Sequence, residues 1–323
     1  MAIYLSEADV RQVLTMDIAL AQVERGFVDR AQGKAVDVAR VRTRLPGAHL
    51  HILQAGAPEL NLVGYKAYYI KPDKSRSSLV HLFNREQGNL EAILEADWMG
   101  MQRTGAATGV AAKYLAKKNS KVLGLFGYGR HAMTQLEAVS RVRQLTDVKV
   151  FARNAERVAA FCAEMGARLK LNVRPATSRE EAVKGSDMIV IMTRATEPLF
   201  DGKWLEPGQF IAAAGSNALD RREVDLETVK RADPVVVDSR ETAQNECGDL
   251  LPAYEAGIIN WNTLPDLGEV VIGRRRGRQD GAEGEAQIIL YESHGMGLQD
   301  IYTGARVLEL ARSRGLGTAL PFA

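Results

Sequence analysis

The stretch that decides the fold is Val122-Leu-Gly-Leu-Phe-Gly-Tyr-Gly-Arg-His-Ala132, an apolar run followed by the pattern Gly-x-Gly-x-x-Ala. The apolar run predicts a buried strand, and the residues after it predict a helix that reaches about Gln144. Gly127 permits a tight turn, Gly129 lets the backbone approach a pyrophosphate, and the alanine allows close helix–strand packing. Between a strand and a helix, this pattern predicts a dinucleotide site whose phosphates lie at the helix N-terminus. The alternative is a glycine-rich turn that binds no ligand.

The same alternation of short apolar runs and helical segments continues downstream. Further strands are expected at Val148–Ala152, Asp187–Met192, Gln209–Ala214 and Pro234–Asp238, and helices at Asn154–Met165, Arg179–Lys184 and Asp225–Lys230. Strands and helices at this spacing predict a parallel sheet with right-handed crossovers. We therefore expect residues 116–296 to form a Rossmann NAD(P)-binding domain. The basic run Arg274–Arg278 is interpreted as a solvated turn, with a phosphate contact as the alternative.

The end of the second strand of this domain bears on the choice of cofactor. A carboxylate there would bind the ribose 2′-hydroxyl of NAD, but the segment reads Phe151-Ala-Arg-Asn154, with Arg157 one turn further on. Arginine suits a 2′-phosphate. The sequence therefore favours NADP(H) and leaves NAD(H) open, the alternative being that Arg153 is a solvated residue that stacks loosely on adenine.

The first 115 residues lack this regularity. Ser6 to Asp9 resembles the start of a helix, and a longer amphipathic helix is expected at Asp17–Gln32. Strands are expected at Val41–Leu45, Leu50–Leu53, Val63–Ile70 and Leu79–Asn84, separated by turn residues. They predict a largely antiparallel sheet that carries helices. The amphipathic segment Asp300–Ser313 is expected to pack on it, so that residues 1–115 and 297–323 form one discontinuous α+β domain of an α/β protein.

Composition excludes several classes of partner and site. The 42 Lys and Arg residues nearly balance the 40 Asp and Glu residues, which gives no reason to expect nucleic acid or an anionic membrane as a partner. The two cysteines, Cys162 and Cys247, show no metal-ligand spacing, and no metal site is expected. No secretory signal or membrane span is evident, so a cytoplasmic protein is expected.

Eight ordered motifs resemble those of the ornithine cyclodeaminase/mu-crystallin family, over nearly the whole chain. They are Val63-Gly-Tyr-Lys66, Arg103-Thr-Gly-Ala-Ala-Thr108, Gly127-Tyr-Gly-Arg-His131, Gly215-Ser-Asn217 with Arg222-Glu-Val-Asp225, Asp238-Ser-Arg-Glu241, Glu246-Cys-Gly-Asp249, Gly277-Arg278 and Ser293-x-Gly295. The resemblance implies a central Rossmann domain and a substrate and dimerisation domain built from both chain ends. It also implies a homodimer in which the sheets of the first domains pair. The family includes cyclodeaminases, alanine dehydrogenases and ketimine reductases, so the resemblance leaves the reaction open.

The resemblance also implies roles for individual residues. Lys66, Arg42 and Arg103 are expected to bind the carboxylate of an amino or imino acid, with Arg44 one register step from Arg42. Lys66 is also the candidate for proton transfer; by spacing alone, it could equally lie on the solvent face of its strand. Arg103, followed by Thr104 near the start of a helix, would touch both substrate and cofactor. The expected cofactor-binding residues are Arg103, Thr104, Gly127, Gly129, Arg130, His131, Arg153, Asn154, Thr193, Gly215, Ser293 and Gly295. His131 meets the pyrophosphate or caps the helix.

One departure from the family pattern bears on the reaction. Cyclodeaminases and alanine dehydrogenases of the family have an aspartate where this chain has Asn217, whose amide can hydrogen-bond an amine but cannot act as a base. We therefore interpret the chain as an NAD(P)H-dependent imine or ketimine reductase, equivalently an amino-acid dehydrogenase, with Lys66 and Asn217 in catalytic positions. The alternatives are a cyclodeaminase-type lyase that uses NAD catalytically and a non-catalytic ligand-binding protein.

Two further expectations concern side chains around this site. The basic residues Arg44, Lys71, Lys74 and Arg76 leave room for a second substrate carboxylate. Cys247 has no histidine base near it in sequence, so a role as nucleophile is not expected.

Overall fold

Backbone packing divides the chain into two units, unit 1 (Met1–Arg103 and Met296–Ala323) and unit 2 (Thr104–Gly295). The computed structural model describes residues 1–71, 73 and 76–321, without the side chain of Arg76. The division expected at residues 115 and 116 falls instead at 103 and 104, within helix α3 (Asp97–Leu115). Gly105 explains the shift, because a Cβ there would lie 2.3 Å from the carbonyl oxygen of Thr134 in α4 (Arg130–Val142). The second half of α3 therefore packs as part of unit 2.

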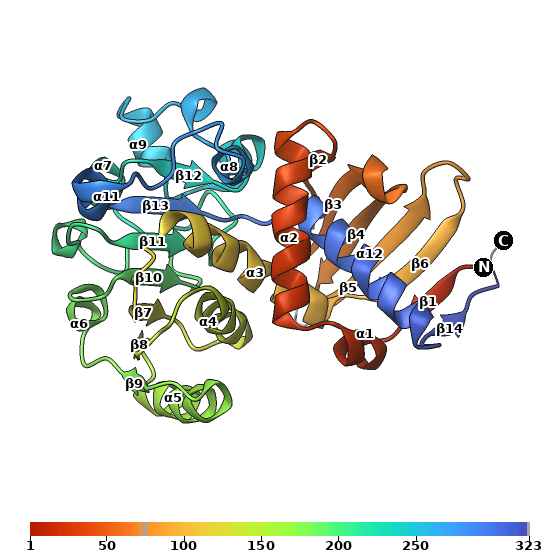
Figure 1. The fold of residues 1–323 in the computed structure, drawn as a ribbon, viewed down its shortest axis with the longest axis horizontal. Coiled ribbons are helices and arrows are strands. Elements are labelled where there is room, and N and C mark those ends of the chain that lie inside the picture. Colours follow the sequence, from red (N-terminus) through yellow and green to blue (C-terminus); the bar gives the residue numbers. More distant parts are fainter. Residues whose placement is uncertain (72, 74–75, 322–323) are drawn as a thin grey trace. The chain divides into compact units, whose positions relative to one another are not determined.

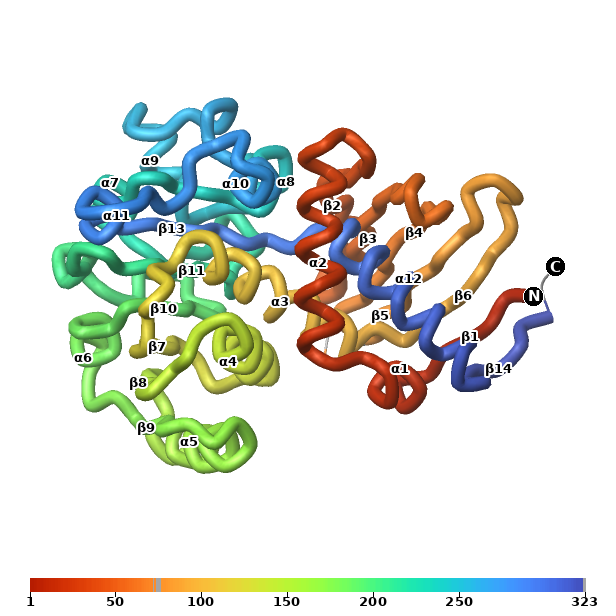
Figure 2. The backbone as a smooth tube through the Cα atoms, in the orientation of Figure 1, coloured from red at the N-terminus to blue at the C-terminus, as the bar shows by residue number. Residues whose placement is uncertain are grey.

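Unit 1 contains a sheet in the order β14-β1-β6-β5-β4-β3-β2. Its strands are β1 (Ile3–Leu5), β2 (Val36–Leu45), β3 (Ala48–Ala57), β4 (Leu62–Ile70), β5 (Arg76–Asn84), β6 (Leu90–Glu95) and β14 (Thr318–Ala319). All neighbours are antiparallel except β1 and β6, which run parallel. Strand β1, at the N-terminal end of the chain, lies beside β14 (Figure 2). The expected antiparallel sheet is therefore present, with β1, β6 and β14 as strands that the sequence did not indicate.

Helices cover one face of this sheet. Helix α12 (Gly297–Ser313) lies across β2 to β5, with α2 (Met16–Ala31) packed beside it (Figure 1). Helix α1 (Glu7–Val13) begins with a capping box of Ser6 and Asp9, and a 3-10 turn, η1 (Pro58–Leu60), precedes β4. Beneath the helices lie the buried Leu53, Val80 and Leu82. The opposite face carries apolar side chains that remain exposed.

Unit 2 contains a parallel sheet in the order β12-β13-β11-β10-β7-β8-β9. The strands are β7 (Val122–Phe126), β8 (Asp147–Phe151), β9 (Val173–Pro175), β10 (Met188–Ile191), β11 (Phe210–Ala213), β12 (Val235–Val237) and β13 (Ile289–Glu292). The chain runs outward from β7 through β8 to β9 and then returns to β10 on the other side of β7. Ligands of doubly wound sheets bind outside the carboxyl ends of the strands at such a switch point.

Helices α4 to α11 connect these strands. Their bounds are α5 (Ala155–Leu169), α6 (Arg179–Val183), α7 (Leu226–Arg231), α8 (Arg240–Glu246), α9 (Leu251–Glu255), α10 (Leu267–Val271) and α11 (Gly281–Ala286), with 3-10 turns η2 (Gly202–Trp204) and η3 (Trp261–Thr263). Within the described residues, no helix combines the length and apolarity needed to span a membrane. The Rossmann fold expected from the glycine pattern is confirmed.

The basic run Arg274–Arg278 is only partly a solvated turn. Its first three residues are exposed, but Arg278 is half-buried, and its guanidinium donates to the carbonyl oxygens of Leu115 at 2.7 Å and Gln287 at 3.0 Å. Burial lowers the pKa of this arginine to about 10. Arg278 therefore holds the end of α3 to the loop before β13, and its hydrogen bonds go to backbone oxygens rather than to a phosphate.

Candidate active site

Lys66 lies on the covered face of the unit 1 sheet, where an apolar side chain would be the ordinary choice. Its neighbours across the ladder are Leu53 on β3 and Val80 on β5, and its own side chain is 3% exposed. Its Nζ lies 2.8 Å from Oδ1 and 2.7 Å from Oδ2 of Asp300, in the first turn of α12. The structure thus places Lys66 in the interior and not on the solvent face, and a buried carboxylate balances its charge.

Arg103 completes the cluster around Asp300. Its Nε donates to Asp300 Oδ1 at 3.0 Å, and its Nη1 donates to Gln299 Oε1 at 3.0 Å. Arg103 lies in the second turn of α3, which begins six residues earlier than the helix start expected beside Arg103. With Lys66 protonated, two buried cations share one carboxylate. The excess positive charge suits an anionic ligand, and a substrate carboxylate is the simplest such anion.

The burial of Lys66 changes its acid–base behaviour. Desolvation and the neighbouring Arg103 lower its pKa to about 7, against the opposing effect of Asp300. A lysine with this pKa can donate or accept a proton near neutral pH, as a general acid or base requires.

The buried arginine of β2 is a different residue from the arginine that was predicted to bind the substrate carboxylate. The β2–β3 register shifts between Val38 and Val41, and Arg40 becomes buried, with 9% exposure. Its guanidinium carbon lies 6.0 Å from the ring centre of Tyr68, and Lys66 Nζ lies 5.8 Å from the same ring. Arg40 was not predicted from the sequence to lie in the site. Arg42, the expected carboxylate ligand, is half-buried opposite His51.

Two of the other basic residues proposed for a second carboxylate have described side chains. Arg44 and Lys71 are exposed, whereas Lys74 and the side chain of Arg76 fall outside the described residues.

At the glycine turn of unit 2, the backbone at the start of α4 is not covered by side chains of the turn glycines. Gly127 adopts φ +118°, and a Cβ there would lie 2.5 Å from the carbonyl oxygen of Met192. Gly129 is the N-cap of α4, and among the described residues no side chain caps the helix there and a Cβ would meet no atom within 4 Å. Helix amides at an uncapped N-terminus that faces open space fit a phosphate group. Arg130 and His131 are the first two residues of the helix, and His131 is therefore not its N-cap.

The remaining expected cofactor residues follow the carboxyl ends of four strands of the parallel sheet, and these ends lie at the same edge of the sheet. These are Arg153 and Asn154 after β8, Thr193 after β10, Gly215 with Asn217 after β11, and Ser293 and Gly295 after β13. Arg153 is exposed and makes no hydrogen bond or ion pair with the described residues. The Asn154 side chain caps α5 by accepting from the Arg157 amide at 2.9 Å. The carbonyl oxygen of Thr104 accepts from Gln135 at 3.4 Å.

Glu223 also lies at this edge, and it was not predicted from the sequence as a site residue, although it belongs to the Arg222-Glu-Val-Asp225 motif. Its carboxylate accepts the Thr193 amide at 2.8 Å and the Gly215 amide at 2.9 Å, and so joins the ends of β10 and β11. Burial raises its pKa to about 7. Asp300 in unit 1 was also not predicted from the sequence as a site residue. An acidic residue near the start of a helix is equally typical of exposed helix ends, so its position gave no signal.

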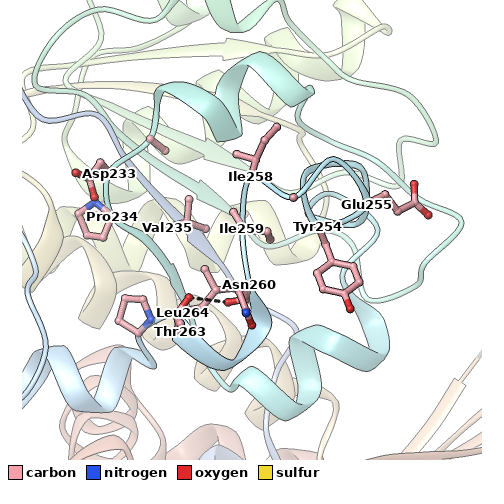
Figure 3. A pocket seen from close by; sticks show the side chains of 13 residues that line it. Asp233, Pro234, Val235, Tyr254, Glu255, Ile258, Ile259, Asn260, Thr263 and Leu264 are labelled. Carbon is pink, nitrogen blue, oxygen red and sulfur yellow. Dashed lines mark hydrogen bonds between the residues drawn. The ribbon is translucent and has the colours of Figure 1, made fainter.

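A surface pocket of unit 2 lies apart from these residues. It is lined by Asp233–Val235 and by residues between Tyr254 and Pro265, and its hydrogen bond from Thr263 to Asn260 is drawn in Figure 3. Among the described residues that line it are two carboxylates and no basic side chain. The pocket therefore does not suit an anionic substrate or a dinucleotide.

Comparison with known proteins identifies the family. The family model for ornithine cyclodeaminase/mu-crystallin proteins matches residues 2–315. The chain belongs to this family. An alanine dehydrogenase of Archaeoglobus fulgidus is 32% identical over 98% of both chains.

Among solved structures of the ornithine cyclodeaminase/mu-crystallin family, two align over nearly their whole length. The Δ1-pyrroline-2-carboxylate reductase of Thermococcus litoralis, in complex with NADH and L-proline, has a TM-score of 0.92 at 30% identity and covers 98% of this chain and 100% of its own. An archaeal alanine dehydrogenase dimer with bound NAD has the same TM-score and identity and covers 100% of this chain and 99% of its own. The resemblance read from the eight motifs is therefore confirmed.

Proposed function

We propose that the protein is an NAD(P)H-dependent imine or ketimine reductase, equivalently an amino-acid dehydrogenase, that acts on the C–N bond of a small α-imino or α-amino acid. The observation that carries this proposal is the buried Lys66–Asp300–Arg103 cluster, with its excess positive charge and its lysine of near-neutral pKa. The similarity to a pyrroline-2-carboxylate reductase and to alanine dehydrogenases supports the same class of reaction.

The cluster binds the carboxylate of the substrate. Lys66 and Arg103 of the cluster, together with Arg40 beside the same Tyr68 ring as Lys66, carry three positive charges. Asp300 carries one negative charge, so a substrate carboxylate brings this group of side chains closer to neutrality. Asp300 accepts from both Lys66 and Arg103 and fixes their positions before the substrate arrives. This preorganisation reduces the entropy that substrate binding would otherwise cost.

Imine reduction also requires a proton on nitrogen. When bound, the nicotinamide supplies the hydride that adds to the imine carbon. The ammonium group of Lys66 donates a proton to the substrate nitrogen, and in the oxidative direction the neutral amine of Lys66 accepts that proton, as its pKa near 7 permits. Asn217 donates or accepts a hydrogen bond but exchanges no proton, which favours a reductase over a lyase that needs repeated proton transfer.

The unit 2 edge holds the dinucleotide. Gly127, Gly129 and the first amides of α4 receive the pyrophosphate, and Thr193, Gly215, Ser293 and Gly295 line the same edge toward the nicotinamide end. Arg153 lies exposed after β8, where the adenosine ribose of a Rossmann cofactor binds. Its charge favours the 2′-phosphate of NADP(H) over the hydroxyl of NAD(H).

The protein acts as a homodimer. The uncovered face of the unit 1 sheet exposes Val36, Val41 and Val63, with exposed fractions of 61%, 51% and 45%. Pairing of two such faces would remove these side chains from water. The archaeal relative described as a dimer is consistent with this arrangement.

A panel of cyclic and linear imino acids, each tested with NADH and NADPH, tests the function. We expect at least one to drive oxidation of the cofactor, followed by loss of nicotinamide absorbance. Ammonia release from a diamino acid without net change in that absorbance would show the lyase instead. Nucleotide binding without turnover of any imino acid would show a ligand-binding protein.

A variant of Lys66 tests whether the cluster takes part in the reaction. Lys66→Ala should lower turnover by about 10²- to 10⁴-fold, the usual contribution of a proton-transfer group, while nucleotide affinity stays near its original value. Lys34→Ala removes an exposed lysine of unit 1 and serves as the control. Full turnover in Lys66→Ala would contradict the proposed role.

A further inference from the structure

Gln299 is a buried polar side chain next to the Lys66–Asp300–Arg103 cluster of unit 1. It lies in the first turn of α12, directly before Asp300, and is 2% exposed. Buried amide groups in folded proteins are almost always hydrogen-bonded, because water is not there to replace a missing partner. The partners of the Gln299 amide therefore bear on what binds beside Asp300.

Arg103 fixes the orientation of this amide. Its Nη1 donates to Gln299 Oε1 at 3.0 Å. A guanidinium group only donates hydrogen bonds, so the amide oxygen, and not the amide nitrogen, must face it. The opposite orientation would bring two donors together. The NH₂ group of Gln299 is therefore left for a different acceptor.

The described residues do not supply that acceptor. Nε2 of Gln299 is shielded from solvent, and it has no hydrogen-bond partner among them. A buried donor that stays unpaired destabilises the fold, whereas the same donor strengthens the binding of any ligand that offers it an acceptor. The NH₂ group is therefore a candidate contact for a ligand of the cluster.

The charges around Gln299 favour an anionic acceptor. Lys66 Nζ and Arg103 Nε both donate to Asp300 Oδ1, at 2.8 Å and 3.0 Å, so that two cations share one carboxylate. A ligand carboxylate balances the remaining positive charge, and its two oxygens offer about four lone-pair sites, enough for a third donor. A neutral amide suits that third position, because it adds no further charge to the buried cluster.

We propose that Gln299 binds the substrate directly, by donating a hydrogen bond from Nε2 to the carboxylate of the α-imino or α-amino acid. This inference rests on the proposed function, since it assigns a further contact to the same substrate. Gln299 exchanges no proton and carries no charge, so its contribution is to affinity and to the position of the carboxylate. It therefore helps the site to select acids over the corresponding amides.

The variant Gln299→Glu tests this contact, because it keeps an oxygen for Arg103 and replaces the NH₂ donor with a second oxygen. The probes are pyrrole-2-carboxylate, an unreactive cyclic acid, and pyrrole-2-carboxamide, each titrated by calorimetry into the full chain with excess NADPH. The Kd of the acid should rise at least about tenfold, as expected for a lost hydrogen bond to a charged group. The amide should bind the variant at least as well as the wild type, because its own NH₂ can donate to the new oxygen.

Gln87→Glu makes the same chemical change at an exposed position between β5 and β6, and should keep the affinity for the acid. If Gln299→Glu does not fold, the neutral Gln299→Met, which also lacks the donor, should show the same loss for the acid.

Three results would overturn the contact. They are an unchanged Kd for the acid in the Gln299 variant, an equal loss for acid and amide in Gln299→Glu, which a merely structural role predicts, and a wild-type chain that binds neither probe. A wild-type chain that binds the acid through Gln299 but reduces no imino acid would instead refute the proposed reaction and leave the contact standing.

Discussion

At the scale of single residues, Lys66 shows how burial changes the chemistry of a side chain. The same lysine on the open face of the sheet would keep its charge in water. Enclosed beneath α12 with Arg103 nearby, it has a pKa of about 7 and is held by Asp300. The carboxylate prevents the penalty of burial from removing the charge altogether.

This pKa predicts opposite pH profiles for the two directions of the proposed reaction. Because the pKa is lowered, Lys66 is protonated below about pH 7 and neutral above it. Imine reduction needs the protonated form, so kcat/KM should fall as pH rises through about 7, while amino-acid oxidation should rise over the same interval. Initial rates in both directions across neutral pH check this. Profiles that move together, or that bend only near the pKa of an exposed lysine, would exclude Lys66 as the proton donor.

Arg153 allows a second prediction at this scale. Arg153→Asp replaces a cation after β8 with the carboxylate that suits a ribose hydroxyl, and should shift the kcat/KM ratio of NADPH to NADH toward NADH by at least about tenfold, or roughly 1.4 kcal/mol. Arg179→Asp makes the same charge change at an exposed position on α6 and should leave the ratio alone. An unchanged ratio in Arg153→Asp would refute the preference for NADP(H).

At the scale of elements, the N-terminus of α4 can be tested without disturbing the fold. Gly129 has an ordinary φ of −77°, and a Cβ there meets no atom of the described residues within 4 Å. Gly129→Ala should therefore leave the thermal midpoint nearly unchanged, yet its methyl group would occupy the space that a pyrophosphate needs. We expect dinucleotide affinity, measured by fluorescence titration, to fall at least about tenfold.

The control is Gly100→Ala on α3, where a Cβ also meets no atom of the described part of the chain within 4 Å and alanine has the better helix propensity. This variant should bind the dinucleotide normally. If Gly129→Ala does the same, the phosphates do not lie over this turn.

The bounds of helices and strands were predicted well where the local sequence pattern sets them. They were predicted poorly where groups distant in the sequence set them. Helix α2 and strands β4, β7 and β8 begin and end within a residue or two of expectation. Helix α3 begins six residues before Arg103 because the side chain of Glu7, 90 residues earlier, accepts the amide of Asp97, and that of Trp98 at 3.1 Å. No local signal marks a cap supplied by another helix.

At the scale of the whole molecule, the uncovered face of the unit 1 sheet predicts association. Val41→Lys combined with Val63→Lys places charges on that face, and twofold symmetry would bring each change into the interface twice. The dissociation constant of the dimer, measured by sedimentation, should rise at least about 100-fold.

Ile258→Lys changes a comparably exposed apolar residue of unit 2 and should leave the dimer intact. Unaltered dimers in the double variant would show that the protein associates through a different surface.

The sequence by itself determined the Rossmann fold and the family, and the family resemblance implied that Lys66 and Arg103 belong to one site. Local signals carry these features: the period of apolar residues, the glycines that a tight turn requires, and motifs quoted in order along the chain. It also indicated that the last long helix returns to the first unit.

Only the tertiary structure decided which groups meet across long separations. Asp300 reaches Lys66 over 234 residues, Glu223 joins the ends of two strands, and a register shift in β2 turns Arg40 inward. His294 comes beside Cys247 in the same way. The physical reason is that burial and electrostatic pairing depend on distances in space, which the folded chain sets and which spacing along the sequence does not encode.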